Sequence, residues 1–352
     1  IRETDTPLQT LVLHLADKVT DVTCDLFYVA DEENDAIIRS ARFENRSGRP
    51  VWLDRTASLS LDVHHGEPVD LIPFTGRHNK ERQFTRRRLE QGIVSAGSTR
   101  GTSSHQQNPA VILTGPDTTE TNGWAVGAML VYSGSFRADV EMDQLGQARL
   151  VMGINPYGFR WKLGPGEHFQ TPEAVLIRSD EGLGALSRRF HRLIRQRLIP
   201  SRFKNRPRPV LINTWEAAYF NFDRKTILNI ARQAADMDID LLVLDDGWFG
   251  RRNSDNAGLG DWEVNEKKLE GSLQSLIEEV NAAGLDFGIW IEPEMVNEDS
   301  NLYRNHPEWC MKIPGRQPNV ERGQMALDLC RKEVRDYLFD SITKILDEGA
   351  ID

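Results

Sequence analysis

The stretch Leu241-Leu-Val-Leu-Asp-Asp-Gly-Trp-Phe-Gly250 decides the fold of its half of the chain. Its four leading aliphatic residues predict a short, fully buried strand. The strand ends at Asp245 and Asp246, and in a parallel α/β sheet this end is where side chains leave the core and meet ligand. Carboxylates accept hydroxyl hydrogen bonds and the indole of Trp248 can cover a pyranose, so the pattern indicates a sugar site. The alternative is that one Asp caps the next helix and Trp248 belongs to the core.

The residues on both sides of this stretch alternate between strand and helix. Strands are predicted at residues 210–213, 241–244, 287–291 and 325–329, and helices at 223–235, 266–283 and 332–348. Asp223 caps the first of these helices and Gly284 ends the second. Such repeats form a parallel sheet, and a closed barrel of this kind needs eight of them. We therefore expect residues 209–352 to form the N-terminal half of a (β/α)8-type barrel, truncated after about four βα units.

Residues 1–180 show a different pattern. Short β-rich runs, such as the alternating Leu59-Ser-Leu-Asp-Val63, are separated by turn clusters such as Asn45-Arg-Ser-Gly48. This pattern predicts an antiparallel β-sandwich. Residues 181–208 are expected to join the two domains through a helix, whose apolar face recurs at helical spacing up to Leu198, and a Pro/Arg-rich connection. The predicted fold class is thus multidomain, β followed by α/β.

Composition and charge narrow the function classes. The chain of 352 residues carries a net charge of -10, which argues against a nucleic-acid partner. No apolar run reaches about 18 residues, so no membrane span is expected. Cys24, Cys310 and Cys330 have no zinc-ligand spacing, so we expect buried free thiols and no metal. No secretory signal is visible, which favours a cytoplasmic protein, although the start at Ile1 leaves a removed leader as an alternative.

Polar and aromatic residues recur where the predicted strands end. Each has an ordinary alternative: Glu294 as a helix-starting charge, Trp290 as a core residue, Arg322 as a surface cation. Their recurrence at the same end of successive strands is what favours a site. No phosphate-binding loop, serine nucleophile elbow or histidine pair at metal spacing competes with it. The residues concerned are Trp215, Glu216, Asp245, Asp246, Trp290, Glu292, Glu294 and Arg322.

One segment of the first domain differs from the rest. Arg77-His-Asn-Lys-Glu-Arg82 and Arg86-Arg-Arg88 are basic, and Ser103, Ser104, His105 and Asn108 follow. A solvated loop explains the arginines well. The alternative is that the segment lines a site or packs against another subunit.

Several motifs in this order resemble the α-galactosidases of glycoside hydrolase family 36. The resemblance covers nearly the whole chain, and the separate motifs make it specific. The motifs are Arg100-Gly-Thr-Ser-Ser-His105 with Asn108-Pro109, Asn213-Thr-Trp-Glu-Ala217, Leu244-Asp-Asp-Gly-Trp-Phe-Gly250, Gly260-Asp-Trp262, Gly288-Ile-Trp-Ile-Glu-Pro-Glu-Met-Val296 and His306-Pro-Glu-Trp309.

The resemblance implies a retaining hydrolysis of terminal α-linked galactose, as in melibiose or raffinose, without a cofactor. By this likeness Asp245 and Asp246 would hold the galactose O4 and O6 hydroxyls. Trp215 and Trp290 would line the galactose pocket, and Arg322 would contact the sugar or orient the nucleophile. The full-length protein would be a homo-oligomer. The molecule that it binds would be a galactoside substrate.

The resemblance also implies that the catalytic residues of the family are missing. Its nucleophile and its acid/base are aspartates that follow later barrel strands, and the chain ends at Asp352 before the first of them. We therefore expect no catalytic residue in this chain and no hydrolysis by the chain alone. The alternatives are a transglycosylase of the raffinose-synthase type and a non-catalytic sugar-binding or assembly module.

Overall fold

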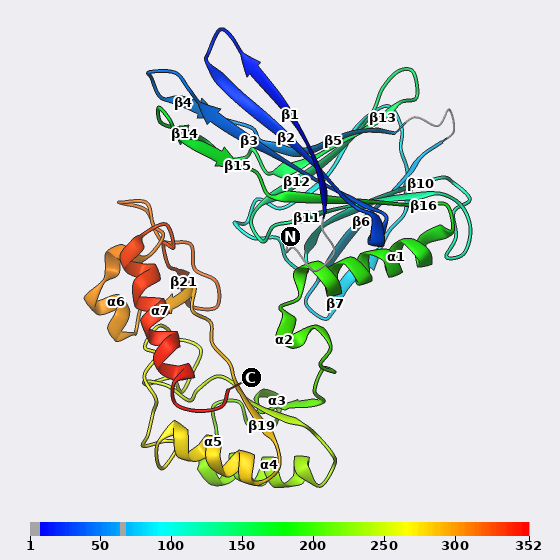
Figure 1. Cartoon of the computed structure of the whole chain (residues 1–352). Helices are drawn as coiled ribbons and strands as arrows, with labels where there is room; N and C mark the ends of the chain where they lie inside the picture. Colours follow the sequence, from blue (N-terminus) through cyan, green and yellow to red (C-terminus); the bar gives the residue numbers. More distant parts are fainter. Residues whose placement is uncertain (1–7, 64–67, 352) are drawn as a thin grey trace. The chain divides into compact units, whose positions relative to one another are not determined.

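A computed structural model describes residues 8–63 and 68–351, and the chain divides into two compact units, Ile1–Arg206 and Pro207–Asp352 (Figure 1). The first unit is built mainly of antiparallel strands and the second alternates parallel strands with helices. The fold class expected from the sequence, β followed by α/β, is confirmed.

Two antiparallel sheets form most of the first unit. The larger has the order β1-β2-β3-β16-β11-β10-β6-β7, with β15 and β8 pairing at β3 and β6. The smaller has the order β5-β13-β12-β9, and β4 pairs with β14 separately. The strands are β1 (Gln9–Asp17), β2 (Val22–Asp31), β3 (Ala36–Asn45), β4 (Val51–Leu53), β5 (Ala57–Val63), β6 (Asp70–Arg77), β7 (Lys80–Phe84), β8 (Arg87–Arg88), β9 (Gly92–Gly97), β10 (Gln107–Thr114), β11 (Ala125–Val131), β12 (Phe136–Met142), β13 (Ala148–Ile154), β14 (Trp161–Leu163), β15 (His168–Gln170) and β16 (Glu173–Ser179).

Alternation along the strands creates the core of this unit. In β12, Phe136, Ala138 and Val140 are buried, whereas the residues between them point outward. The predicted alternation of β5 is confirmed, since Leu59 and Val63 are buried and Ser60 is exposed. Because successive side chains of a strand point to opposite faces, each sheet covers one shared apolar layer.

The predicted helix after the sheets belongs to this first unit. Helix α1 (Gly182–Leu193) continues into a π-helical turn, η2 (Ile194–Leu198), and α2 (Ser201–Lys204) follows. The apolar face of α1 packs on the larger sheet, where Leu186 and Leu193 are buried. A Cβ at Gly127 would lie 2.5 Å from the Phe190 ring, so the helix packs closely only because β11 carries glycine there.

The second unit contains a parallel sheet of three strands, β17 (Leu211–Asn213), β18 (Leu241–Leu244) and β19 (Asp286–Ile289). Its longer helices are α4 (Arg224–Ala235), α5 (Leu273–Ala282) and α7 (Lys332–Leu346). Asp223 caps α4 as predicted, accepting a hydrogen bond from the backbone N–H of Thr226. Helix α5 begins later than the predicted residue 266, because Ser272 caps it and turns precede it. The short elements are η1 (Glu32–Asn34) in the first unit and α3 (Trp215–Ala218), α6 (Asn301–Asn305) and η3 (Pro307–Trp309) in the second.

The expected fourth parallel strand is wrong. Strand β21 (Gln324–Ala326) pairs antiparallel with β20 (Met295–Asn297) and does not join the parallel sheet. Arg322 and Gly323 both have positive φ angles, and they form the tight hairpin turn between Glu321 and Gln324 that leads into β21. Within the described residues the sheet is therefore open after three strands rather than closed into a barrel.

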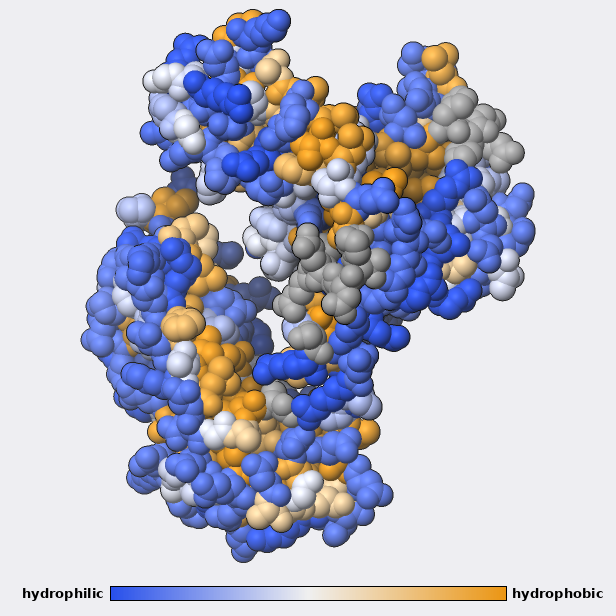
Figure 2. Space-filling view, in the orientation of Figure 1, coloured by the Kyte–Doolittle hydropathy of each residue, from blue (hydrophilic) through white to orange (hydrophobic). Residues whose placement is uncertain are grey.

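Surface and cysteines complete the description. Hydrophilic residues cover most of the visible face of both units, with apolar residues gathered in smaller patches (Figure 2). Among the described residues no helix is long and apolar enough to cross a membrane. All three cysteines are free, but only Cys310 is buried; Cys330 is exposed, so the expectation of buried thiols is wrong there.

Candidate functional site

The carboxyl ends of the three parallel strands lie in register. The backbone N–H of Thr214 donates to the Val243 carbonyl, and that of Trp290 donates to the Leu244 carbonyl. The residues that follow β17, β18 and β19 therefore lie at one edge of the sheet, which we call the strand-end edge. Trp215, Asp245, Asp246 and Trp290, all predicted from the sequence as site residues, sit on or next to it.

Asp245 is fixed by the neighbouring strand. Its Oδ2 accepts a hydrogen bond of 2.6 Å from Asn213 Nδ2, and its backbone N–H donates to Thr214 Oγ1 at 3.0 Å. Its Oδ1 accepts from the backbone N–H of Asp246 at 2.7 Å. The carboxylate is partly exposed, so lone pairs remain for a ligand. No helix follows directly, so neither Asp caps a helix, and that alternative is wrong.

Asp246 is paired with an arginine, Arg252, that was not predicted from the sequence. Arg252 is completely buried and Asp246 is 4% exposed. Arg252 Nη2 lies 2.7 Å from Asp246 Oδ2, and Arg252 Nε lies 2.9 Å from Oδ1. Such a fork fixes the carboxylate plane as well as its position. Because both oxygens accept from one cation, the Asp246 carboxylate has a fixed orientation toward a ligand.

Arg322 joins the same cluster from the hairpin turn that precedes β21. Its side chain is 59% exposed, and its Nη2 donates to Asp255 Oδ1 at 3.0 Å. Asp255 Oδ1 also lies 3.7 Å from Arg252 Nη2. The charges thus alternate from Asp246 through Arg252 and Asp255 to Arg322. Arg322 is a surface cation, as the ordinary alternative held, and it is ion-paired with Asp255.

Two glutamates follow β19 and face this cluster. Glu292 is half-buried, and burial raises its pKa, with the neighbouring charge of Glu294 adding to the effect. Arg322 and Arg252 act in the opposite direction, and Asp246 raises the pKa further. Glu292 therefore interacts electrostatically with Asp246 and with the arginines around it.

The aromatic residues of the site differ in exposure. Trp248 is completely buried and its Nε1 donates to the Trp290 carbonyl at 3.0 Å, so it is a core residue, as the alternative held. Trp290 and Trp215 are partly buried. The Trp215 ring meets Tyr219 edge-on, with a centroid distance of 5.1 Å. Trp215 and Trp290 therefore offer ring surface to a ligand.

Lys268 is a second member that sequence analysis missed. Its Nζ donates to the Gly247 carbonyl at 2.9 Å and lies 4.1 Å from the centroid of the Phe222 ring. Burial lowers the pKa of Lys268 to about 8, against the attraction of Asp246. Lys268 lies close in sequence to the Gly260-Asp-Trp262 motif, but this short spacing does not reveal its contact with Gly247.

The arrangement suits a neutral polyhydroxylated ligand. Carboxylate acceptors, a guanidinium donor and partly exposed indole rings are the groups that bind hydroxyls and the apolar face of a sugar. Among residues 8–63 and 68–351, no cluster of His, Cys, Asp and Glu could hold a metal ion.

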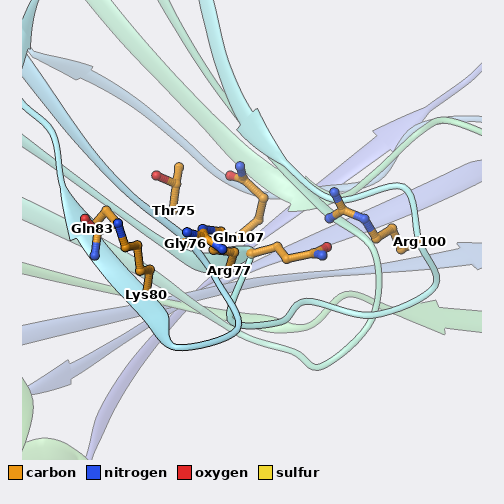
Figure 3. Close-up of a pocket in the computed structure, with 8 residues that line it drawn as sticks. Thr75, Gly76, Arg77, Lys80, Gln83, Arg100 and Gln107 are labelled. Carbon is orange, nitrogen blue, oxygen red and sulfur yellow. The ribbon is translucent and has the colours of Figure 1, made fainter.

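The basic segment of the first unit forms a separate hollow of about 420 Å³. Figure 3 shows Lys80 and Gln83 on one side of it, Arg100 on the other and Arg77 between them. Arg86 and Arg88 point elsewhere, since they pair with Asp70 at 2.8 and 2.5 Å. Part of the arginine run therefore stabilises the fold rather than forming a solvated loop.

Comparison with known proteins agrees with the geometry. The model of the glycosyl hydrolase family 36 N-terminal domain matches residues 2–164, and that of melibiase matches residues 168–352. The chain is 50% identical over 344 residues to the bifunctional alpha-galactosidase/sucrose kinase AgaSK of Mediterraneibacter gnavus. It is 47% identical over 343 residues to the alpha-galactosidase AgaA of Geobacillus stearothermophilus. These alignments cover 98% and 97% of this chain, but only 37% and 47% of the relatives.

Solved structures give the same result. The crystal structure of an AgaA variant in complex with stachyose matches with a TM-score of 0.96 at 46% identity, covering 99% of this chain and 49% of that chain. A variant in complex with raffinose matches with a TM-score of 0.94 at 46% identity, covering 97% and 48%. The chain thus spans about half the length of these relatives or less.

Proposed function

The chain belongs to glycoside hydrolase family 36, and from this premise we propose that the protein it forms is an α-galactosidase. Its substrates would be oligosaccharides with terminal α-linked galactose. AgaA variants bind stachyose and raffinose, which supports this class of substrate. The proposed reaction is retaining, and the protein would work without a cofactor.

The observation that carries the proposal is the placement of Asp245 and Asp246. Two adjacent carboxylates stand at the strand-end edge, one held by Asn213 and the other by Arg252. In the proposed complex they accept hydrogen bonds from the O4 and O6 hydroxyls of galactose. A buried acceptor discriminates strongly against a sugar whose hydroxyl is absent or inverted, because the acceptor is then left unpaired.

The remaining predicted residues complete the proposed pocket. Trp215 and Trp290 would cover the apolar face of the galactose ring. Arg322 would donate to the sugar or orient the nucleophile, since its exposed guanidinium has donors beyond the one that Asp255 accepts. In this proposal the five binding residues do not react themselves; they are Asp245, Asp246, Trp215, Trp290 and Arg322.

We propose further that the isolated 352-residue chain does not hydrolyse galactosides. A retaining glycosidase needs two carboxyl groups about 5–5.5 Å apart, one as nucleophile and one as acid/base. Asp246 is committed to Arg252, which disfavours it for either role. In the proposed enzyme neither reacting carboxylate is among the binding residues named above.

Three measurements test this proposal. Calorimetric titration compares galactose with its C4 epimer glucose for the wild-type chain and for Asp245→Asn. Preference for galactose that is lost in the variant supports the pocket, and equal affinity for both sugars contradicts it. Turnover of an activated α-galactoside by the chain itself, abolished in Asp246→Ala, would contradict the assignment of binding roles. Turnover with net transfer of galactose to a second sugar by the full-length protein would favour the transglycosylase.

Two broader properties also remain proposals. We propose that the full-length protein is a homo-oligomer and acts in the cytoplasm. Sedimentation equilibrium of the full-length protein and fractionation of cells that produce it test these two statements separately. A monomeric mass would contradict the first, and recovery outside the cytoplasm the second.

A further inference from the structure

We propose that Arg252 and Asn297 are positioning residues that hold Asp246 and Arg322 at a fixed separation for the sugar. The inference rests on the proposed function, because it takes Asp246 and Arg322 as galactose contacts. We call Asp246, Arg252, Asp255, Asn297 and Arg322 the Arg252 network.

Each nitrogen of the Arg252 side chain has a hydrogen-bond partner inside the protein. Besides the fork to Asp246, its Nη1 donates to the carbonyls of Asp255 and Ala257 at 2.9 and 3.2 Å, and to Asn297 Oδ1 at 2.9 Å. The side chain is completely buried, so water does not replace a lost partner at low cost. Asp246 therefore cannot rotate without leaving a buried guanidinium unpaired, which gives the carboxylate one orientation.

Asn297 connects this cation to the hairpin that carries Arg322. Its Oδ1 accepts from Arg252 and from the backbone N–H of Leu259, the latter at 3.0 Å. Its Nδ2 donates to the carbonyls of Asp255 and Gly323 at 3.0 and 2.9 Å. An amide side chain has two donors and one two-fold acceptor, and all of them are used. Gly323 directly follows Arg322, so Asn297 fixes the turn from which Arg322 extends.

Asp255 closes the network at the surface. It accepts from the exposed Arg322 and also lies 3.7 Å from the buried Arg252. Asp255 therefore links the two arginines. Ordering a free arginine at the moment of binding costs side-chain entropy. A guanidinium that is already ordered by Asp255 avoids most of that cost, and this is the expected contribution of the network to affinity.

A purely structural role is the competing explanation, and kinetic constants separate the two. The experiment uses the full-length enzyme with raffinose, comparing Arg252→Lys with Arg251→Lys, whose exposed arginine lies 3.7 Å from Asp299. Lysine keeps the charge but cannot form the fork. We expect Arg252→Lys to raise KM about tenfold with a smaller change in kcat, because the sugar-binding geometry is lost. A structural role would instead lower the active fraction and leave KM unchanged.

Asp255→Asn is the milder second variant, because Asp255 is partly exposed and its loss leaves the core intact. We expect it to raise KM roughly threefold by releasing Arg322. The pH at which the Glu292 carboxyl titrates is a further readout. Arg252 lowers the pKa of Glu292, so Arg252→Met should move the titration of Glu292 to higher pH, which loss of folded protein alone would not do.

Asp246→Asn separates failure of the inference from failure of the proposed function. If Asp246→Asn raises KM while Arg252→Lys and Asp255→Asn keep KM within twofold of the wild type, the inference is overturned and the sugar site stands. If Asp246→Asn itself leaves KM unchanged, the assigned role of Asp246 is overturned, and the inference with it.

Discussion

The two units each contain a completely buried arginine paired with a buried aspartate, and the pairs have different surroundings. In the first unit Arg197 Nε lies 3.0 Å from Asp31 Oδ2 and ties η2 to the end of β2. In the second unit Arg252 forks onto Asp246 at the strand-end edge. Asp31 also accepts from the amide of Asn34, whereas Asp246 raises the pKa of both Lys268 and Glu292 near the strand-end edge. A buried ion pair alone therefore does not identify a site; the charges and aromatic rings around it do.

The largest expected effect is shared by both pairs. Arg197→Met and Arg252→Met each leave a buried carboxylate without its cation, which typically costs about 3–5 kcal/mol. We expect the free energy of unfolding of the affected unit to fall by that amount. Urea titration followed by hydrogen exchange reports each unit separately. The exposed neighbours provide controls, and Arg195→Met and Arg251→Met should stay within about 0.5 kcal/mol.

The next expected effect distinguishes the pairs. Asp31→Asn and Asp246→Asn should both lower stability, because each leaves a buried guanidinium without a carboxylate partner. Only Asp246→Asn should raise the KM for raffinose, by tenfold or more, which corresponds to at least about 1.4 kcal/mol. Steady-state kinetics of the full-length enzyme, corrected for the folded fraction, measure this. An equal rise in KM for both variants would remove the distinction between the two regions.

A pH dependence of stability should appear in the second unit. Burial lowers the pKa of Lys268 to about 8 from its usual value of 10.5, so between these two values the unfolded chain binds more protons than the folded one. Stability therefore rises with pH across this window, and below about pH 8 the cost of burying the charged amine is constant. Lys268 is only half-buried, so after solvent screening we expect a gain of about 1–2 kcal/mol. Thermal melts from pH 7.5 to 10.5 measure it, and Lys268→Met should remove the slope.

Local sequence signals predicted much of the fold and the core of the site. The apolar run 241–244 and the cap at Asp223 were found because each depends on neighbouring residues. Arg252 was missed because Gly247 and Gly250, both with positive φ, fold the six-residue loop back on Asp246, and spacing does not reveal such a turn. The pairing of Arg322 with Asp255 spans 67 positions, so nothing near either residue indicates it.

The smallest expected effect concerns the neutral partner of the first pair. Asn34 is completely buried and its Nδ2 donates to Asp31 Oδ2 at 2.9 Å and to Gln196 Oε1 at 2.7 Å, while its Oδ1 has no hydrogen-bond partner. Asn34→Ala loses two hydrogen bonds but also removes an unsatisfied acceptor, and these terms partly cancel. We expect the first unit to lose under about 1 kcal/mol, with the KM for raffinose unchanged. Asn297→Ala is the matched variant in the second unit, where all four hydrogen bonds are used and no such compensation exists. It should cost more stability and also raise KM; a loss no larger than that of Asn34→Ala would show that the Arg252 network is no more constrained than the pair in the first unit.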